Sequence, residues 1–278
     1  MSLATSLVDV GRRTHRGVRE ITLLGVLYAG YSVTRTFADQ NLGRARDHAV
    51  ELQSVEQGLG LNLEGPLNQW LLGSPLLRVF ASYWYASLHY VVTAVVLVWL
   101  YRRSRATSYL PARRALVLAS LAGLACYLLM PLAPPRFMPG YIDILHVTAP
   151  LGWWGADASA PRGLGGYTNE LAAFPSLHAG WALWVALVVT RETRSRRWRT
   201  LAWAYAVATA AVIVGTGNHW ILDVVGGWAV VLAGWFIAAQ PVGRRTAQPA
   251  ASRASALRTS SGSEVVHIGG SEARRKAP

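Results

Sequence analysis

The chain has 278 residues, of which 52% are hydrophobic and 15% charged, a balance that argues against an ordinary soluble domain and indicates a membrane protein. Its net charge of +13 comes almost wholly from arginines that stand in short clusters between apolar runs, which argues against a nucleic-acid-binding groove. The single cysteine, Cys126, lies inside an apolar run and is expected to serve in packing, because this sequence offers it no disulfide partner.

Six hydrophobic runs are long enough, or nearly so, to cross about 30 Å of hydrocarbon as helices. They cover about residues 20–37, 80–101, 113–131, 174–190, 200–217 and 220–239. The first run follows four arginines and has no cleavage signal, so it is interpreted as a retained span. The expected fold class is therefore all-α, a polytopic membrane protein whose six transmembrane helices form one domain over residues 20–242.

Arginine clusters orient these helices, because short loops rich in arginine stay in the cytoplasm. The clusters lie between the second and third runs, between the fourth and fifth, and after the sixth: Arg102, Arg103, Arg105, Arg113 and Arg114; Arg191, Arg194, Arg196, Arg197 and Arg199; and Arg244 and Arg245. Both termini are then cytoplasmic. Residues 1–19 form an N-terminal segment, and residues 243–278, rich in Ala, Ser, Arg and Gly, form a disordered tail.

The same orientation places two connecting segments outside. Residues 41–72 carry apolar positions at helical spacing and predict one amphipathic helix on the outer surface. Residues 131–173 are rich in Pro, Gly and Trp and longer than a connector needs to be, which is typical of a lid or substrate rim. The residues with catalytic side chains also fall at the outer face, so the predicted location is the cell membrane, with the site on its extracytoplasmic side.

His219 and Asp223 stand four residues apart, which on a helix places both side chains on one face. The carboxylate can then accept a proton from one imidazole nitrogen and leave the other nitrogen free to attack phosphorus. The alternatives are a buried polar pair without a catalytic role and a pair that binds a metal. A charged residue within a span is costly without a use, which favours the catalytic interpretation.

His178 and Ser176 open the fourth run, just after Pro175. The amides at such a helix start, together with the serine hydroxyl, form an anion cradle, and His178 can protonate a departing alcohol. Arg136, in the segment APPRFMP, offers a guanidinium that matches phosphate oxygens, although alone it could equally be an interfacial arginine. His89, inside the second run, either lines the cavity or is a packed, hydrogen-bonded histidine.

The segments FPSLHAGW and GTGNHWILDVVGG resemble signatures of the type 2 phosphatidic acid phosphatase superfamily, of the forms Pro-Ser-x-His and His-x-x-x-Asp. That superfamily has a six-helix membrane fold. The resemblance implies that His219 becomes phosphorylated, that Asp223 orients it, and that His178 protonates the leaving group. Arg136 would correspond to the arginine of the first signature. APPRFMP and GNHW are similar to the branch that includes inositol phosphorylceramide synthases.

The chain departs from the usual signatures where they carry cations. Leu129 and Phe137 stand where the first signature has a lysine and a proline, and Ile213 stands where the third has an arginine. The synthase-like branch also lacks those cations, so the departures indicate a subfamily. Arg162, or the counterion of a lipid head group, could compensate for the lost charge.

The predicted function is that of an integral membrane lipid phosphatase or phosphotransferase. Its catalytic residues would be His219, His178 and Asp223, with Arg136 and Ser176 binding a lipid phosphate or phosphodiester. A phosphohistidine would pass its group, for instance an inositol-phosphate-type head group, to water or an alcohol. The scheme requires no metal and no cofactor, and the expected partners are the lipid substrate, the acceptor and the bilayer, without nucleic acid.

Two other functions remain open on the sequence. One is an intramembrane serine hydrolase that uses Ser176 with His219, because such pairs also lie near the ends of spans. The other is a non-catalytic lipid transporter or scaffold with the same fold.

Overall fold

The computed structural model describes residues 41–103, 106–155 and 169–240, together with a few isolated positions between 18 and 30. The predictions for the first run at 20–37, for Arg162, and for the terminal segments 1–19 and 243–278 therefore lie outside the described residues. Within them the chain is all-helical, as predicted, and strand-like features are limited to isolated bridge residues, among them the parallel bridge between Leu132 and Ala172.

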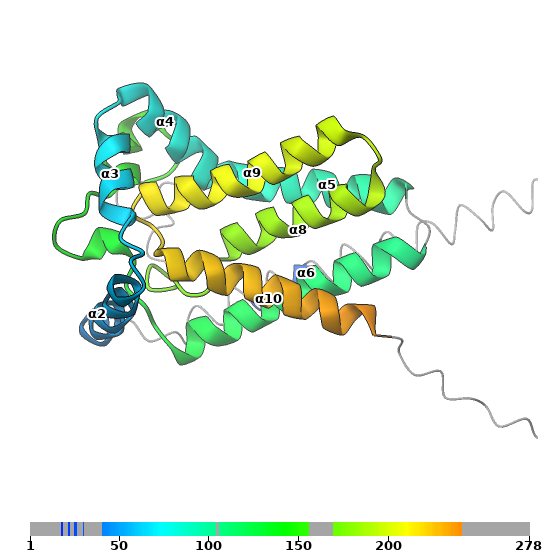
Figure 1. Ribbon diagram of the computed structural model, residues 1–278, viewed down its shortest axis with the longest axis horizontal. Helices are drawn as coiled ribbons and strands as arrows, with labels where there is room; N and C mark the ends of the chain where they lie inside the picture. The colour runs from blue at the N-terminus through cyan, green and yellow to red at the C-terminus, as the bar shows by residue number, and fades with distance from the viewer. Residues whose placement is uncertain are drawn as a thin grey trace, which may run out of the picture. The chain divides into compact units, whose positions relative to one another are not determined.

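Nine α-helices follow one another along the described chain (Figure 1). They are α2 (Leu42–Gly58), α3 (Glu64–Leu72), α4 (Pro75–Tyr83), α5 (His89–Arg103), α6 (Ala106–Leu129), α7 (Ile144–Thr148), α8 (Leu177–Glu192), α9 (Arg196–Gly215) and α10 (Ile221–Ala239). A π-helical turn, Trp84–Leu88, joins α4 to α5, and two 3₁₀ turns, Pro135–Phe137 and Ala149–Leu151, lie in the loop before α8.

Four of the predicted runs are helices long and apolar enough to cross a membrane: Pro75–Arg103, Ser108–Leu129, Arg196–Gly215 and Ile221–Ala239. They correspond to the second, third, fifth and sixth runs. The fourth run forms α8, whose 16 residues reach only about 24 Å at 1.5 Å per residue.

Helix α8 lies among the longer helices and packs against α5, α6, α9 and α10 (Figure 1). Small residues on α8, among them Ala179, Gly180 and Ala186, let its neighbours come close, as is usual between membrane helices. Tryptophans of α8 form hydrogen bonds with α6; for example, the Trp184 indole N–H donates to the Ala112 carbonyl at 2.8 Å. The helix that opens with Ser176 and His178 is therefore enclosed by protein along most of its length.

The segment 41–72 forms two helices, so the prediction of one continuous amphipathic helix is wrong. Helix α2 ends at Gly58, and Gly60 adopts φ +71, a left-handed conformation that interrupts the helix and that glycine takes without strain. The predicted apolar stripe divides accordingly. Ala45 and Ala49 are fully buried, whereas Val55 and Leu59 are exposed.

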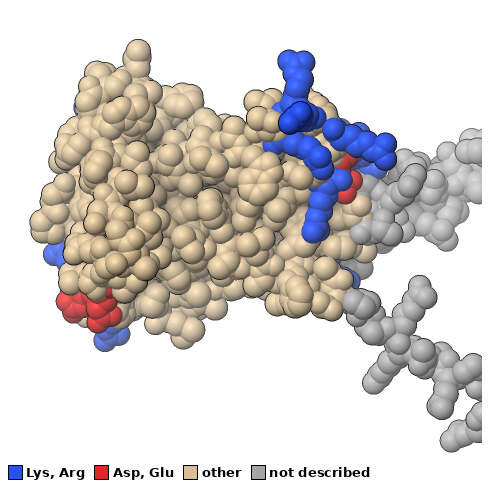
Figure 2. Space-filling model, in the orientation of Figure 1, with Lys and Arg blue, Asp and Glu red and all other residues tan. Residues whose placement is uncertain are grey.

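Charged side chains are distributed unevenly along the helices. On the face drawn in Figure 2, arginines gather at one end, over the connection between α8 and α9, and the surface between the two ends shows no charged side chain. The arginines of this connection and of the C-terminal end of α5 are exposed: Arg191, Arg194, Arg196, Arg197 and Arg199, with Arg102 and Arg103. An uncharged band between charged ends is the surface that a bilayer requires.

Candidate active site

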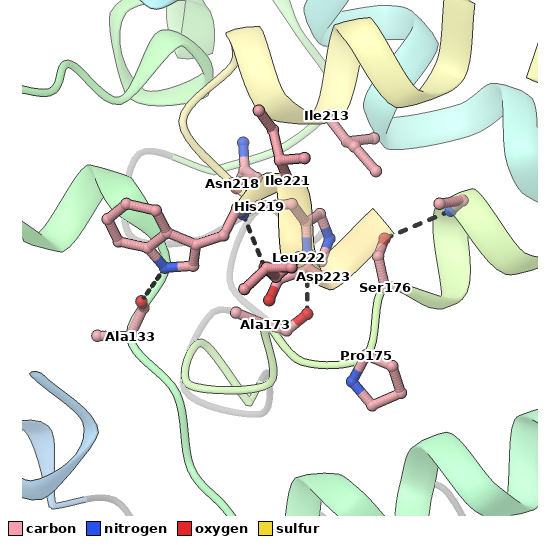
Figure 3. Close-up of polar contacts among 12 residues, drawn as sticks. Ala133, Ala173, Pro175, Ser176, Ile213, Asn218, His219, Ile221, Leu222 and Asp223 are labelled. Carbon is pink, nitrogen blue, oxygen red and sulfur yellow. Dashed lines mark hydrogen bonds and ion pairs between the residues drawn. The ribbon is translucent and has the colours of Figure 1, made fainter. Parts of the chain in front are cut away.

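Figure 3 shows Ser176, at the start of α8, beside Asp223, in the first turn of α10, and the two residues are joined main chain to main chain. The Ser176 N–H donates to the Asp223 carbonyl at 2.8 Å. A Cβ placed on Gly227 would overlap the Ser176 carbonyl oxygen, and one placed on Gly180 would lie 2.9 Å from the Gly227 carbonyl oxygen. The two helices approach each other this closely because both positions are glycine, and this contact fixes the spacing of the two loops.

The turn between α9 and α10 brings His219 to the site. Gly217 has φ +75, and a Cβ there would lie 3.0 Å from the Ile142 carbonyl oxygen, so both conformation and space require glycine. The Gly217 carbonyl accepts the backbone N–H of Arg136 at 2.8 Å. Arg136 and His219 are thereby attached to the same turn.

His219 is 3% exposed, and its Nδ1 lies 3.0 Å from the Ala173 carbonyl oxygen and 3.3 Å from Asp223 Oδ2. A carbonyl oxygen only accepts, so Nδ1 carries the proton and Nε2 carries the lone pair. The pKa of His219 is lowered to about 3, chiefly by burial and also by the charge of Arg136, against the opposing effect of the hydrogen bond to the Ala173 carbonyl. The ring is therefore neutral at physiological pH, which is the form that can act as a nucleophile.

Asp223 is fully buried in the first turn of α10, where its side chain contacts both the backbone of that turn and the ring of His219. Its Oδ2 accepts the backbone N–H of Trp220 at 2.8 Å, a capping interaction, while the same oxygen faces Nδ1 of His219. Its Oδ1 is buried and has no hydrogen-bond partner among the described residues. The predicted contact between His219 and Asp223 is present.

His178 lies between His219 and two residues of the π-helical region. Its ring centroid is 5.4 Å from that of His219, and it stacks on Tyr85 at 4.4 Å with an interplanar angle of 20°. On another side the His89 ring lies 3.9 Å away. His89 is buried and packs against the site, and its Nδ1 has no hydrogen-bond partner in the described part of the chain.

Ser176 is the N-cap of α8, and its hydroxyl oxygen accepts the Ala179 N–H at 3.3 Å. The hydroxyl proton remains available for donation, since accepting a bond does not use it. The N–H groups of Leu177 and His178 are the first two of the helix, and such groups have no partner within an α-helix. This helix start can therefore receive an anion beside the two histidines.

The Arg136 side chain is 6% exposed and already has anionic partners. It lies 3.5 Å from Asp143 and 3.6 Å from Glu170, and it donates to the side-chain oxygen of Asn218. The Arg136 side chain is thus buried beside the turn that carries His219. Its positive charge is shared with two carboxylates.

Four residues of this region had no assigned role in the sequence analysis. Asn218 lies beside His219 in the GNHW segment, and this position in the sequence could have indicated that it belongs to the site. Tyr85, Glu56 and Glu64 carried no such signal, because they lie far in the sequence from both histidine segments. Glu56 accepts the N–H of Leu222, and Glu64 accepts the N–H of Ile221.

The family model described as the PAP2 superfamily matches residues 50–237. The chain belongs to the PAP2 superfamily. The match begins within α2 and ends within α10, so it includes part of α2, all of α3 and both histidine segments. The comparisons with curated proteins and with solved structures gave no match. PAP2 superfamily membership, with the four long apolar helices, indicates a membrane protein with a lipid phosphatase-type function.

Proposed function

We propose that the protein transfers the phosphoryl group of a membrane lipid phosphodiester through a phosphohistidine at His219. The observation that carries this proposal is the orientation of His219, whose Nδ1 is held by Ala173 and Asp223 so that Nε2 is left as the nucleophile. His178, 5.4 Å away between ring centroids, is the nearest second imidazole and supplies the acid.

The reaction runs in two balanced steps. Nε2 of His219 attacks phosphorus, the bond from phosphorus to the leaving oxygen breaks, and that oxygen takes a proton from His178. Water or an alcohol then attacks the phosphohistidine while His178 accepts its proton, and the bond between phosphorus and His219 breaks. Arg136, the Ser176 hydroxyl and the amides at the start of α8 hold the phosphoryl oxygens.

A phosphodiester, which carries one negative charge, suits this site better than a phosphomonoester, which carries about two. Arg136 is already paired with Asp143 and Glu170. Ile213, at the position of the family's other arginine, is fully buried and packs in the apolar cluster beneath the site. This shortage of cations supports the branch that includes inositol phosphorylceramide synthases, and an alcohol as the acceptor.

The orientation that we propose places the arginine-rich end in the cytoplasm and the histidines at the extracytoplasmic face of the cell membrane. The exposed arginines at the α8–α9 connection support the cytoplasmic assignment (Figure 2). Six spans then require the first run and α8 to cross together with the four long helices. The loop between α6 and α8 forms the substrate rim.

Trapping of the covalent intermediate tests the reaction. Purified protein in detergent is mixed with a lipid phosphodiester radiolabelled at phosphorus and quenched, and the site of the label is mapped by digestion. We expect acid-labile label on His219, since phosphohistidine is acid-labile. Label or fluorophosphonate modification at Ser176 would instead support a serine hydrolase, and the absence of any turnover would support a transporter or scaffold.

Substrate charge provides a second prediction. We expect the protein to process a phosphodiester lipid at least ~10-fold faster, in kcat/KM, than phosphatidic acid of the same acyl chains, a difference of about 1.4 kcal/mol in transition-state stabilisation. The measurement uses mixed micelles at equal lipid mole fraction. Faster release of phosphate from phosphatidic acid would contradict the phosphodiester assignment while leaving the histidine chemistry intact.

A further inference from the structure

Three consecutive backbone N–H groups at the start of α10 are each accepted by a different carboxyl group. Trp220 donates to Asp223 at 2.8 Å, Ile221 to Glu64 at 3.1 Å, and Leu222 to Glu56 at 2.7 Å. Asp223 belongs to α10 itself. Glu64 and Glu56 come from α3 and α2, more than 150 residues earlier in the chain.

Both glutamates are buried although they belong to the outer helices. Glu56 is 1% exposed and Glu64 is 3% exposed. One oxygen of Glu56, Oε2, is buried and has no hydrogen-bond partner among the described residues. Two carboxyl groups in such a place are costly, because buried charges are tolerated only when they are paired or neutralised. The N-terminus of α10 already has an acidic residue, Asp223, and one such residue is commonly enough to cap a helix. Two further carboxyl groups, from Glu56 and Glu64, therefore exceed what capping alone requires.

Among the described residues, the charged side chains that raise the pKa of Glu56 are both acidic. The titratable groups that influence it from neighbouring elements are Glu64 on α3, Asp223 on α10 and the hydroxyl of Tyr141 in the loop before α8. The pKa of Glu56 is raised to about 8, chiefly by burial and also by the negative charges of Glu64 and Asp223, against the opposing effect of the hydrogen bond from the Leu222 N–H. Glu56 therefore carries a proton at neutral pH.

We propose that Glu56 and Glu64 are positioning residues for the His219–Asp223 pair: their carboxyl groups hold the first turn of α10, and the hold loosens when Glu56 loses its proton. This inference rests on the proposed function for its catalytic consequence. The mechanical link is short, because Ile221 and Leu222 directly follow His219 and Trp220. A shift of that turn moves the Asp223 oxygen that orients Nδ1 of His219.

The direction of the pH effect follows from the two protonation states. The ordinary pKa of a glutamate here is 4.5, and in the folded protein that of Glu56 is about 8, so the folded state binds the extra proton between these values. The stabilisation from this contact is fully present below about pH 4.5 and is lost as the pH rises through about 8. Both unfolding temperature and turnover should fall on the alkaline side.

The test compares Glu56→Gln, Glu56→Leu and the control Glu51→Gln, which changes an exposed glutamate on the same helix. Glutamine keeps an oxygen for the Leu222 N–H and cannot ionise, so it imitates the protonated side chain. Turnover of a lipid phosphodiester and the thermal unfolding midpoint in detergent are both measured from about pH 6 to about pH 9.5. The unfolding series is repeated in a His219→Ala background, which requires no activity.

We expect the wild type and Glu51→Gln to lose turnover about 10-fold from pH 7 to pH 9.5, with a falling midpoint, and Glu56→Gln to lose at most about 2-fold over the same range. Glu56→Leu should have lower turnover and a lower unfolding midpoint than the wild type at every pH, because leucine cannot accept the Leu222 N–H. Of the two substitutions of Glu56, only Glu56→Gln should then preserve function. Equal alkaline profiles in Glu56→Gln and the wild type, or unimpaired Glu56→Leu, would overturn the inference. Full turnover by His219→Ala would instead overturn the proposed function, while the unfolding series would still decide the role of Glu56.

Discussion

Replacement of His219 by alanine should reduce turnover of a lipid phosphodiester by at least ~10³-fold, because it removes the nitrogen that becomes phosphorylated in the proposed mechanism. The His219 side chain is buried, and two partners hold its Nδ1. A water molecule that filled the space left by the imidazole would therefore not be held in the orientation of Nε2 and could not replace it as the nucleophile. The measurement is product release in detergent micelles, with the thermal unfolding midpoint recorded to show that the variant is folded.

His146→Ala is the matched control for that experiment. His146 is an exposed histidine of α7, in the loop before α8, and it has no part in the proposed chemistry. We expect this variant to keep wild-type turnover. Retention of more than about a tenth of the activity by His219→Ala would remove His219 from the covalent step.

Gly227→Ala should prevent the protein from reaching its native packing. The added methyl group would overlap the Ser176 carbonyl oxygen, which is backbone and cannot rotate away, so α8 and α10 must separate. We expect a destabilisation of at least ~3 kcal/mol, the upper range for overpacked cores, with loss of turnover in any protein that still folds. The yield of monodisperse protein in detergent and the unfolding midpoint measure the effect.

Gly65→Ala separates this packing effect from a general intolerance of alanine. Gly65 lies in α3, and a Cβ there would have no neighbour within 4 Å. Because alanine favours the helix over glycine, we expect an unchanged or slightly higher midpoint. A Gly227→Ala protein as stable as this control would mean that the two helices are not in backbone contact.

The sequence predicts a helix well where the helix corresponds to a continuous run of apolar residues. Long apolar runs bounded by arginines predicted all four of the membrane-length helices. The spacing of His219 and Asp223 predicted their contact, although the reason differs in part: α10 begins at Ile221, so His219 precedes the helix and Asp223 reaches it as a capping residue. A spacing of four residues serves both geometries.

Other parts of the site are set by contacts that no local pattern encodes. Glu56 and Glu64 look like the solvent-facing acids of an amphipathic helix, and their burial follows from the docking of α2 and α3 onto the start of α10. The carboxylate partners of Arg136 are likewise known only from the folded loop. The break at Gly60 was missed because apolar spacing continued across it while the backbone did not.

The glycine contact between α8 and α10 has a consequence for how this protein can change. The relative position of the two catalytic loops is determined by main-chain atoms at Ser176, Gly180 and Gly227, and by the bond from the Ser176 amide to Asp223. Exposed apolar side chains farther along the helices, such as Val207 on α9 and Phe236 on α10, take no part in that alignment. Their replacement is therefore expected to leave the reacting groups in register.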